Sequence, residues 1–221
     1  MRRATLVLGA CAVLAWGGSA VAGTIDQSHA IANNSPLVGA APWGTQYELG
    51  QTFTVGLTGR LDQVELYLLE SANATRALHI ELFATTSGLP SGAALASTTF
   101  DPSGTAGSAW RSWILTSPLS VSVGDVLAIV ASDPGSTQPG SFQWQWWSDD
   151  RGGYAGGTDL YRIVGDPWVA YPPRDYDFRT YVNVVPLPPS ALSGLALFGG
   201  WLALARLRRR RSASRTQRQL A

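Results

Sequence analysis

Apolar and polar residues alternate along most of the chain with the period of two that is typical of β-strands. Residues 77–84 show it most clearly, because Leu78, Ile80 and Leu82 alternate with His79 and Glu81. We therefore expect the three aliphatic side chains to face a core and the other two to face solvent. The same pattern predicts further strands at residues 51–55, 61–69, 94–100, 109–116, 125–132, 141–147, 159–164 and 176–184.

Clusters of Gly, Pro, Asp and Ser separate these segments, and no helical periodicity interrupts them. About nine short strands without intervening helices predict an all-β fold, an antiparallel β-sandwich of the jelly-roll type. Residues 51–184 are expected to form this domain. Residues 23–50 lack a clear period and are rich in Asn, Gly and Pro, so we interpret them as an irregular lead-in with one edge strand.

The N-terminal segment has the three parts of a secretory signal peptide. Two arginines precede an apolar run over residues 4–16, and a small-x-small site follows, with cleavage expected between Ala22 and Gly23. The run is shorter than the roughly 20 apolar residues that a membrane-spanning helix needs, which favours cleavage over anchoring. The prediction is a signal helix within residues 1–22, and a lipidation site at Cys11 is the alternative.

The C-terminal segment also has three parts in a fixed order. A proline-containing motif at residues 185–190 is followed by an apolar span, residues 190–207, and by an arginine cluster, residues 206–211. The motif begins with Val185, Pro186, Leu187 and Pro188, and the cluster consists of Arg206, Arg208, Arg209, Arg210 and Arg211. We expect a transmembrane helix whose arginine end and tail, residues 212–221, stay in the cytoplasm while the body lies on the outer side.

This order resembles the PEP-CTERM sorting signal of exported bacterial proteins, in the variant class with Val-Pro-Leu-Pro. The resemblance implies recognition and processing by an exosortase, an integral-membrane cysteine protease, during sorting to the envelope. In the body, the phrases Gln51-Thr-Phe-Thr, Val64-Glu-Leu-Tyr-Leu and Val121-Ser-Val-Gly-Asp are similar to the exported choice-of-anchor domains. That second resemblance covers residues 45–183 and implies a carbohydrate-binding-module-like sandwich.

Charge is segregated along the chain, although the total is only +1. Residues 24–185 contain seven arginines against 15 acids, a net charge of −8, while both ends are basic. A body of this charge repels phosphates, so nucleic-acid binding is not expected. The chain has no lysine and its only cysteine is Cys11, which excludes lysine catalysis as well as a disulfide or a cysteine-ligated metal in the body.

The densest aromatic stretch lies at residues 142–147. Strand alternation places Trp144 and Trp146 in the core and leaves Trp147 exposed beside an acidic turn. Sugar-binding surfaces combine an aromatic plate with polar groups that bond the hydroxyls. The candidate ligand-binding residues are therefore Trp147, Asp149, Asp150, Arg151, Trp168 and Tyr171. The alternative is that these aromatic residues only fill the sandwich core and cover its ends.

Aspartates gather in the predicted loops, at positions 149, 150, 159, 166, 175 and 177. Their carboxylates could hold Ca²⁺, and a solvated acidic surface is the simpler interpretation. No nucleophile, zinc or phosphate-loop motif is present, so no other metal or cofactor is expected.

These patterns together predict a non-enzymatic protein that is exported and held at the cell envelope. It would bind extracellular polysaccharide or contribute to such a matrix. The expected partners are the exosortase-type protease, the membrane and the polysaccharide. An envelope polysaccharide hydrolase with paired carboxylates, or a purely structural surface protein, is the alternative.

Overall fold

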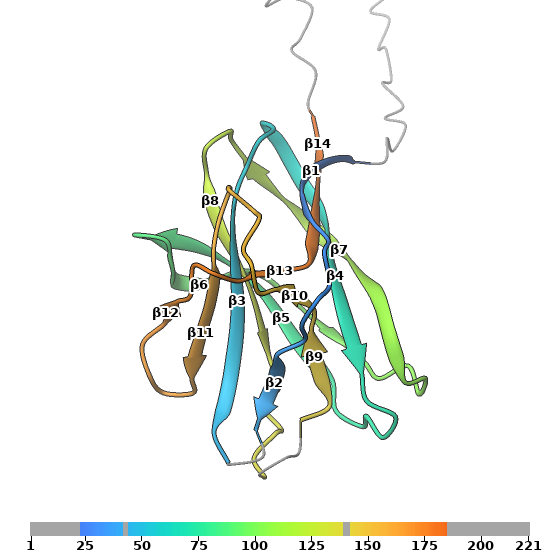
Figure 1. Cartoon of the computed structure of the whole chain (residues 1–221). Coiled ribbons are helices and arrows are strands. Elements are labelled where there is room, and N and C mark those ends of the chain that lie inside the picture. The colour runs from blue at the N-terminus through green and yellow to red at the C-terminus, as the bar shows by residue number, and fades with distance from the viewer. Residues whose placement is uncertain (1–22, 42–43, 139–141, 185–221) are drawn as a thin grey trace, which may run out of the picture.

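The computed structural model describes residues 23–41, 44–138 and 142–184, and these residues fold into antiparallel strands without a helix. Two layers of strands face each other in a sandwich-like arrangement (Figure 1). The expected all-β class is confirmed to this extent. The signal peptide 1–22, the sorting signal 185–211 and the tail 212–221 lie outside the described residues, and so do the two flanking helices expected there.

Every strand expected from residue 51 onward has a counterpart in the structure, and five further strands accompany them. The bounds are β1 (Thr24–His29), β2 (Leu37–Ala40), β3 (Gln46–Thr54), β4 (Gly59–Glu70), β5 (Leu78–Thr86), β6 (Leu89–Phe100), β7 (Gly107–Val121), β8 (Val126–Ser132), β9 (Trp144–Trp146), β10 (Ser148–Asp149), β11 (Asp159–Ile163), β12 (Val169–Ala170), β13 (Asp175–Tyr176) and β14 (Phe178–Asn183).

The first layer is centred on β4, which pairs with β7 from Gly59 to Glu70. The other edge of β4 is shared, because β14 pairs with its first half and β9 with its last three residues. Strand β1 pairs with the outer edge of β14. Alternation along β4 buries Leu66 and Leu68 and turns Tyr67 to the outer face of this layer.

The second layer has the strand order β11-β3-β8-β5-β6. The short strand β2 joins the two layers, because its first half pairs with β9 and its second half with β3. The change of partner occurs at Gly39, where φ is 96°. A Cβ atom at this position would lie 2.7 Å from the side chain of Ser136, so both the backbone and the space favour glycine.

The core follows the alternation that the sequence predicts. The three aliphatic side chains expected to face inward from β5 are fully buried, and His79 between them is exposed. Trp144 and Trp146 are also fully buried, and each indole N–H donates to a backbone carbonyl at 2.9 Å. The ring of Trp146 stacks on that of Tyr176 with a centroid distance of 4.5 Å.

The interpretation of residues 23–50 as an irregular lead-in is wrong. These residues form β1, β2 and the first half of β3, and all three belong to the layers. Their partners β14, β9 and β11 come from the far end of the chain, so long-range pairing stabilises segments whose own patterns are short. This part of the chain supplies one side of the cleft described next.

Candidate functional site

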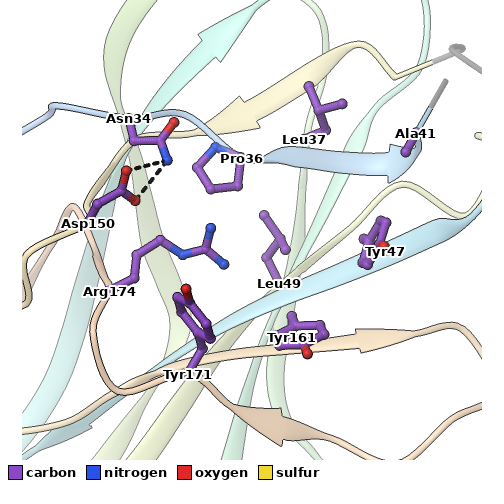
Figure 2. A pocket seen from close by; sticks show the side chains of 10 residues that line it. All are labelled: Asn34, Pro36, Leu37, Ala41, Tyr47, Leu49, Asp150, Tyr161, Tyr171 and Arg174. Atoms are coloured by element: carbon purple, nitrogen blue, oxygen red, sulfur yellow. Dashed lines mark hydrogen bonds between the residues drawn. The ribbon is translucent and has the colours of Figure 1, made fainter.

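A cleft of about 700 Å³ opens beside β2, between the segment leading into this strand and the strands β3 and β11 (Figure 2). Its volume is within the range of small-ligand sites in proteins. The lining residues are Asn34, Pro36, Leu37, Ala41, Tyr47, Leu49, Asp150, Tyr161, Tyr171 and Arg174.

One part of the cleft is apolar and aromatic. Tyr47 and Leu49 are two residues apart on β3 and therefore share a face of the strand, and Tyr161 of β11 stands opposite Leu49 in the sheet register. The rings of Tyr47 and Tyr161 lie 6.4 Å apart between centroids. Pro36 and Leu37 lie across the cleft from them (Figure 2).

The other part of the cleft is polar. Asn34 Nδ2 donates to both carboxylate oxygens of Asp150, each at 2.8 Å. The guanidinium of Arg174 points into the cleft beside them and lies 5.2 Å from the ring centroid of Tyr171 (Figure 2). Hydrogen-bond donors and acceptors therefore meet at one end of an aromatic cleft, an arrangement that suits a ligand with both apolar faces and hydroxyls.

A buried carboxylate fixes the position of Arg174. Its Nε donates to the carboxylate of Asp159, which is fully buried beneath it. Burial raises the pKa of Asp159 to about 7, although the Arg174 charge and hydrogen bond act in the opposite direction. The same guanidinium lies 5.4 Å from the ring of the buried Tyr176, so the fold holds the arginine by three contacts while its outer end faces the cleft.

Two of the six residues predicted to bind a ligand line the cleft, namely Asp150 and Tyr171. Tyr171 remains 46% exposed, and the guanidinium of Arg174 lies over its ring. Trp168 does not line the cleft, and its ring lies 4.6 Å from the guanidinium of Arg162. The loop from 165 to 177 therefore contributes one aromatic residue to the cleft and one to a separate arginine contact.

Trp147 lies in a different place, on the outer face of the first layer. Its ring is 6.1 Å from Tyr67, which is 5.2 Å from Trp110, and the guanidinium of Arg179 lies 3.9 Å above Trp110. We call these four residues the aromatic column. Trp147 is half-buried rather than fully exposed, because its neighbours in the column cover part of the ring.

The carboxylate of Glu65 ends the column. It accepts hydrogen bonds from Ser112 and Tyr181, each at 2.7 Å, and forms an ion pair with Arg179 at 3.3 Å. Burial alone would raise the pKa of Glu65, but these contacts outweigh it and lower the pKa below its ordinary value. The polar groups at this end of the column are thus already paired with one another.

The interpretation of the loop aspartates as a solvated surface is wrong for four of them. Asp149, Asp159, Asp175 and Asp177 are buried, and only those at positions 150 and 166 are exposed. Asp149 accepts from the side chain of Asn33 and from the backbone N–H of residue 151. Asp175 accepts from the backbone N–H groups of residues 153 and 154, each at 3.1 Å. These carboxylates brace turns, and Arg151 lies exposed above them, outside the cleft lining.

A buried ion pair joins β1 to this group of acids. His29 Nδ1 lies 3.1 Å from the carboxylate of Asp177, and both side chains are almost completely buried. Burial lowers the pKa of His29, but the contact with Asp177 and the charge of Asp175 outweigh it, so the net shift is upward from 6.5. Across the described ranges, no group of three His, Cys, Asp or Glu side chains is arranged to hold a metal ion.

The sequence interpretation missed Asn34, Tyr47, Tyr161 and Arg174 as cleft residues. Asn34 and Tyr47 lie in the segment interpreted as a lead-in, and Tyr161 was assigned to a strand without a role. The alternation of Tyr47 with Leu49 was the available signal, since it places both side chains on one face of a strand. Arg174 has no such signal, because its orientation depends on its contact with the buried Asp159.

A scan against protein-family models and a search of curated proteins found no match to this chain. Among residues 23–41, 44–138 and 142–184, the structure contains no helix with the length and apolar character needed to cross a membrane.

Proposed function

We propose that the cleft binds a glycan and that the chain is a non-enzymatic, exported protein of the cell envelope. The observation that carries the glycan proposal is the composition of the cleft, in which three tyrosines and an aliphatic wall meet a cluster of Asn34, Asp150 and Arg174. Sugar rings present C–H faces that pack on aromatic rings and hydroxyls that exchange hydrogen bonds with charged and amide groups. A cleft of this composition matches both properties at once.

Tyr171 is the aromatic side chain best placed to meet a sugar ring in this proposal. It is the most exposed of the three cleft tyrosines, and within the part of the chain that the structure describes no other aromatic ring stacks on it. Tyr47 and Tyr161 are partly buried against the core, so they would form the fixed wall of the cleft. The layered antiparallel strands agree with the jelly-roll, carbohydrate-binding-module-like fold that the resemblance to choice-of-anchor domains implies.

The test of the glycan proposal is affinity electrophoresis in native gels that contain one polysaccharide each, from a panel of β-glucans, mannans, xylans and galactans. We expect retardation by at least one polysaccharide, and we expect Tyr171→Ala to remove most of it. Trp168→Ala is the matched control, because Trp168 lies on the same loop outside the cleft lining. Migration unaffected by every polysaccharide would contradict the proposal and favour a purely structural surface protein.

The proposal of export and anchoring rests on the two ends of the sequence. A signal peptide over residues 1–22 would direct export, and the PEP-CTERM-like segment 185–211 would retain the body outside the cytoplasmic membrane, for recognition by an exosortase-type protease. Deletion of residues 186–221 tests this, with cell fractionation as the measurement. We expect the truncated protein to leave the envelope fraction for the medium or periplasm. Retention equal to that of the full chain would contradict an anchoring role.

A further inference from the structure

We infer that the polar end of the cleft selects neutral saccharides, by exchanging hydrogen bonds with a pair of neighbouring hydroxyls, and discriminates against carboxylated ones. This inference rests on the proposed glycan-binding function and adds the class of glycan. It depends on three groups, the guanidinium of Arg174 and the carboxylates of Asp150 and Asp159.

The outer nitrogens of Arg174 face the cleft as hydrogen-bond donors. Its Nε is bonded to Asp159, and its ring contacts are with Tyr171 and Tyr176. Among the described residues, neither Nη atom has a hydrogen-bond partner. The side chain is 17% exposed and points into the cleft, so its unpaired donors are directed at the space that a ligand would occupy.

Asp150 provides a hydrogen-bond acceptor at the same end of the cleft. Both oxygens of Asp150 accept from the same nitrogen of Asn34, each at 2.8 Å, which holds the carboxylate toward the cleft. Asp150 is exposed, and an ionised carboxylate has about four acceptor sites, so sites remain for hydroxyl donors. A hydroxyl is both donor and acceptor, whereas an ionised carboxylate only accepts. Two neighbouring hydroxyls can therefore accept from Arg174 and donate to Asp150.

Charge distinguishes neutral from carboxylated ligands at this end of the cleft. One arginine at this end of the cleft stands between two acids, Asp150 and Asp159, and the second of these is already paired with it. A ligand carboxylate that accepts from the Nη atoms has no proton to donate to Asp150 and is repelled by its charge, whereas a hydroxyl in the same place can donate to Asp150. The surrounding body is also acidic, with seven arginines against 15 acids. Like charges placed together in this way oppose binding and determine specificity more than affinity.

The experiment compares matched neutral and acidic probes by isothermal titration calorimetry on the full chain. The probes are cellohexaose, mannohexaose and xylohexaose, together with cellohexaose and mannohexaose whose C6 hydroxyls have been oxidised to carboxylates. We expect at least one neutral oligosaccharide to bind. If cellohexaose or mannohexaose binds, its oxidised form should bind at least about tenfold more weakly. If xylohexaose binds, both oxidised oligosaccharides should bind at least about tenfold more weakly than xylohexaose does. We expect Asp150→Asn to reduce this difference to about threefold or less, because it removes the repelling charge and keeps an acceptor oxygen.

Asp166→Asn is the control, since it removes the same charge from an exposed aspartate outside the cleft. The control should keep the full discrimination. Equal or tighter binding of the oxidised probes by the wild-type chain would overturn the inference while leaving the glycan proposal in place. A difference that Asp150→Asn and Asp166→Asn reduce equally would also overturn it, because net charge would then be the cause. If no probe of either class binds, and the polysaccharide panel also fails, the proposed function itself is wrong.

Discussion

The aromatic column and the cleft are both built from aromatic rings and one arginine, yet their polar groups are in opposite states. In the column, Arg179 lies on Trp110 and pairs with Glu65, whose oxygens also accept from Ser112 and Tyr181. In the cleft, Arg174 is held from below by Asp159 and keeps its outer nitrogens unpaired among the described residues. The column is complete by itself, and the cleft has donors and space available for a ligand.

The comparison shows that aromatic density does not by itself identify a binding site. Trp147 and its neighbours pack against one another as tilted rings, with centroids 5.2 and 6.1 Å apart, so they offer little ring face to a sugar. The cleft also has three aromatic rings, but these line a cavity. Unpaired donors beside an open volume distinguish the two regions better than the number of aromatic residues does.

The two regions are joined by one pair of short strands. β10 leads from Trp147 of the column to Asp150 of the cleft, and both of its residues pair with β13. Ser148 and Asp149 between these ends are buried, so the chain passes through the interior and its two ends reach different surfaces. Arg174 and Arg179 are related in the same way along β13 and β14.

The largest expected difference between the regions is the cost of removing each arginine. Arg174→Met leaves the fully buried Asp159 without its partner, and breaking a buried pair in this way costs about 3–5 kcal/mol. Arg179→Met leaves Glu65 with three other side-chain donors near the surface and should cost about 1 kcal/mol or less. Urea unfolding of both variants measures the difference. Equal losses of unfolding free energy would show that the two arginines stabilise the fold to the same extent.

A double variant separates the lost charge from other effects at this site. Asp159→Asn combined with Arg174→Met removes both charges, so we expect it to recover a large part of the stability lost in the single Arg174 variant. No recovery would mean that packing of the arginine on Tyr171 and Tyr176, rather than the ion pair, carries the effect.

A smaller effect is expected from shortening the column. Trp147→Ala removes the ring contact with Tyr67 and the hydrogen bond that the indole donates to Ser108 at 2.8 Å. An aromatic pair and one hydrogen bond of this kind together stabilise a protein by about 1–2 kcal/mol. Urea unfolding should show this loss, while retardation by polysaccharide stays at the wild-type level. A lost retardation with unchanged stability would move the binding site from the cleft to the column.

The sequence predicts the strands from residue 51 onward because each has several alternating positions of its own, as Leu78 to Leu82 illustrate. It does not predict β1 and β2, since these are short, and since β1 and the first half of β2 pair with strands more than 100 positions away. The same limit applies to the site. Asp150 and Tyr171 were found through composition. The hydrogen bond from Asn34 to Asp150 could not be found in this way, because it joins distant parts of the chain.

The smallest expected effect comes from the charge of His29, because its contribution to stability changes only with pH. The pair of His29 with Asp177 lies next to the column, because the backbone N–H of Asp177 donates to the carbonyl of Trp147 at 2.8 Å. The pKa of His29 is raised above 6.5 in the folded state, so the pair stabilises the fold fully below about pH 6.5. This contribution is lost as the pH rises through the folded-state pKa.

His29→Gln should therefore flatten the decline in unfolding free energy above about pH 6.5, and urea unfolding across this range measures it. The contribution of Asp159 falls in the same direction, between its ordinary pKa of 3.8 and its folded-state pKa of about 7, and it is common to the wild type and both histidine variants. His79→Gln is the matched control, because His79 is the only other histidine in the chain and is exposed. If the column and the cleft are separate units joined only through β10 and β13, polysaccharide retardation should depend on pH in the same way in the wild type and in His29→Gln. A loss of retardation with rising pH that His29→Gln removes would instead show that β10 and β13 couple the two regions.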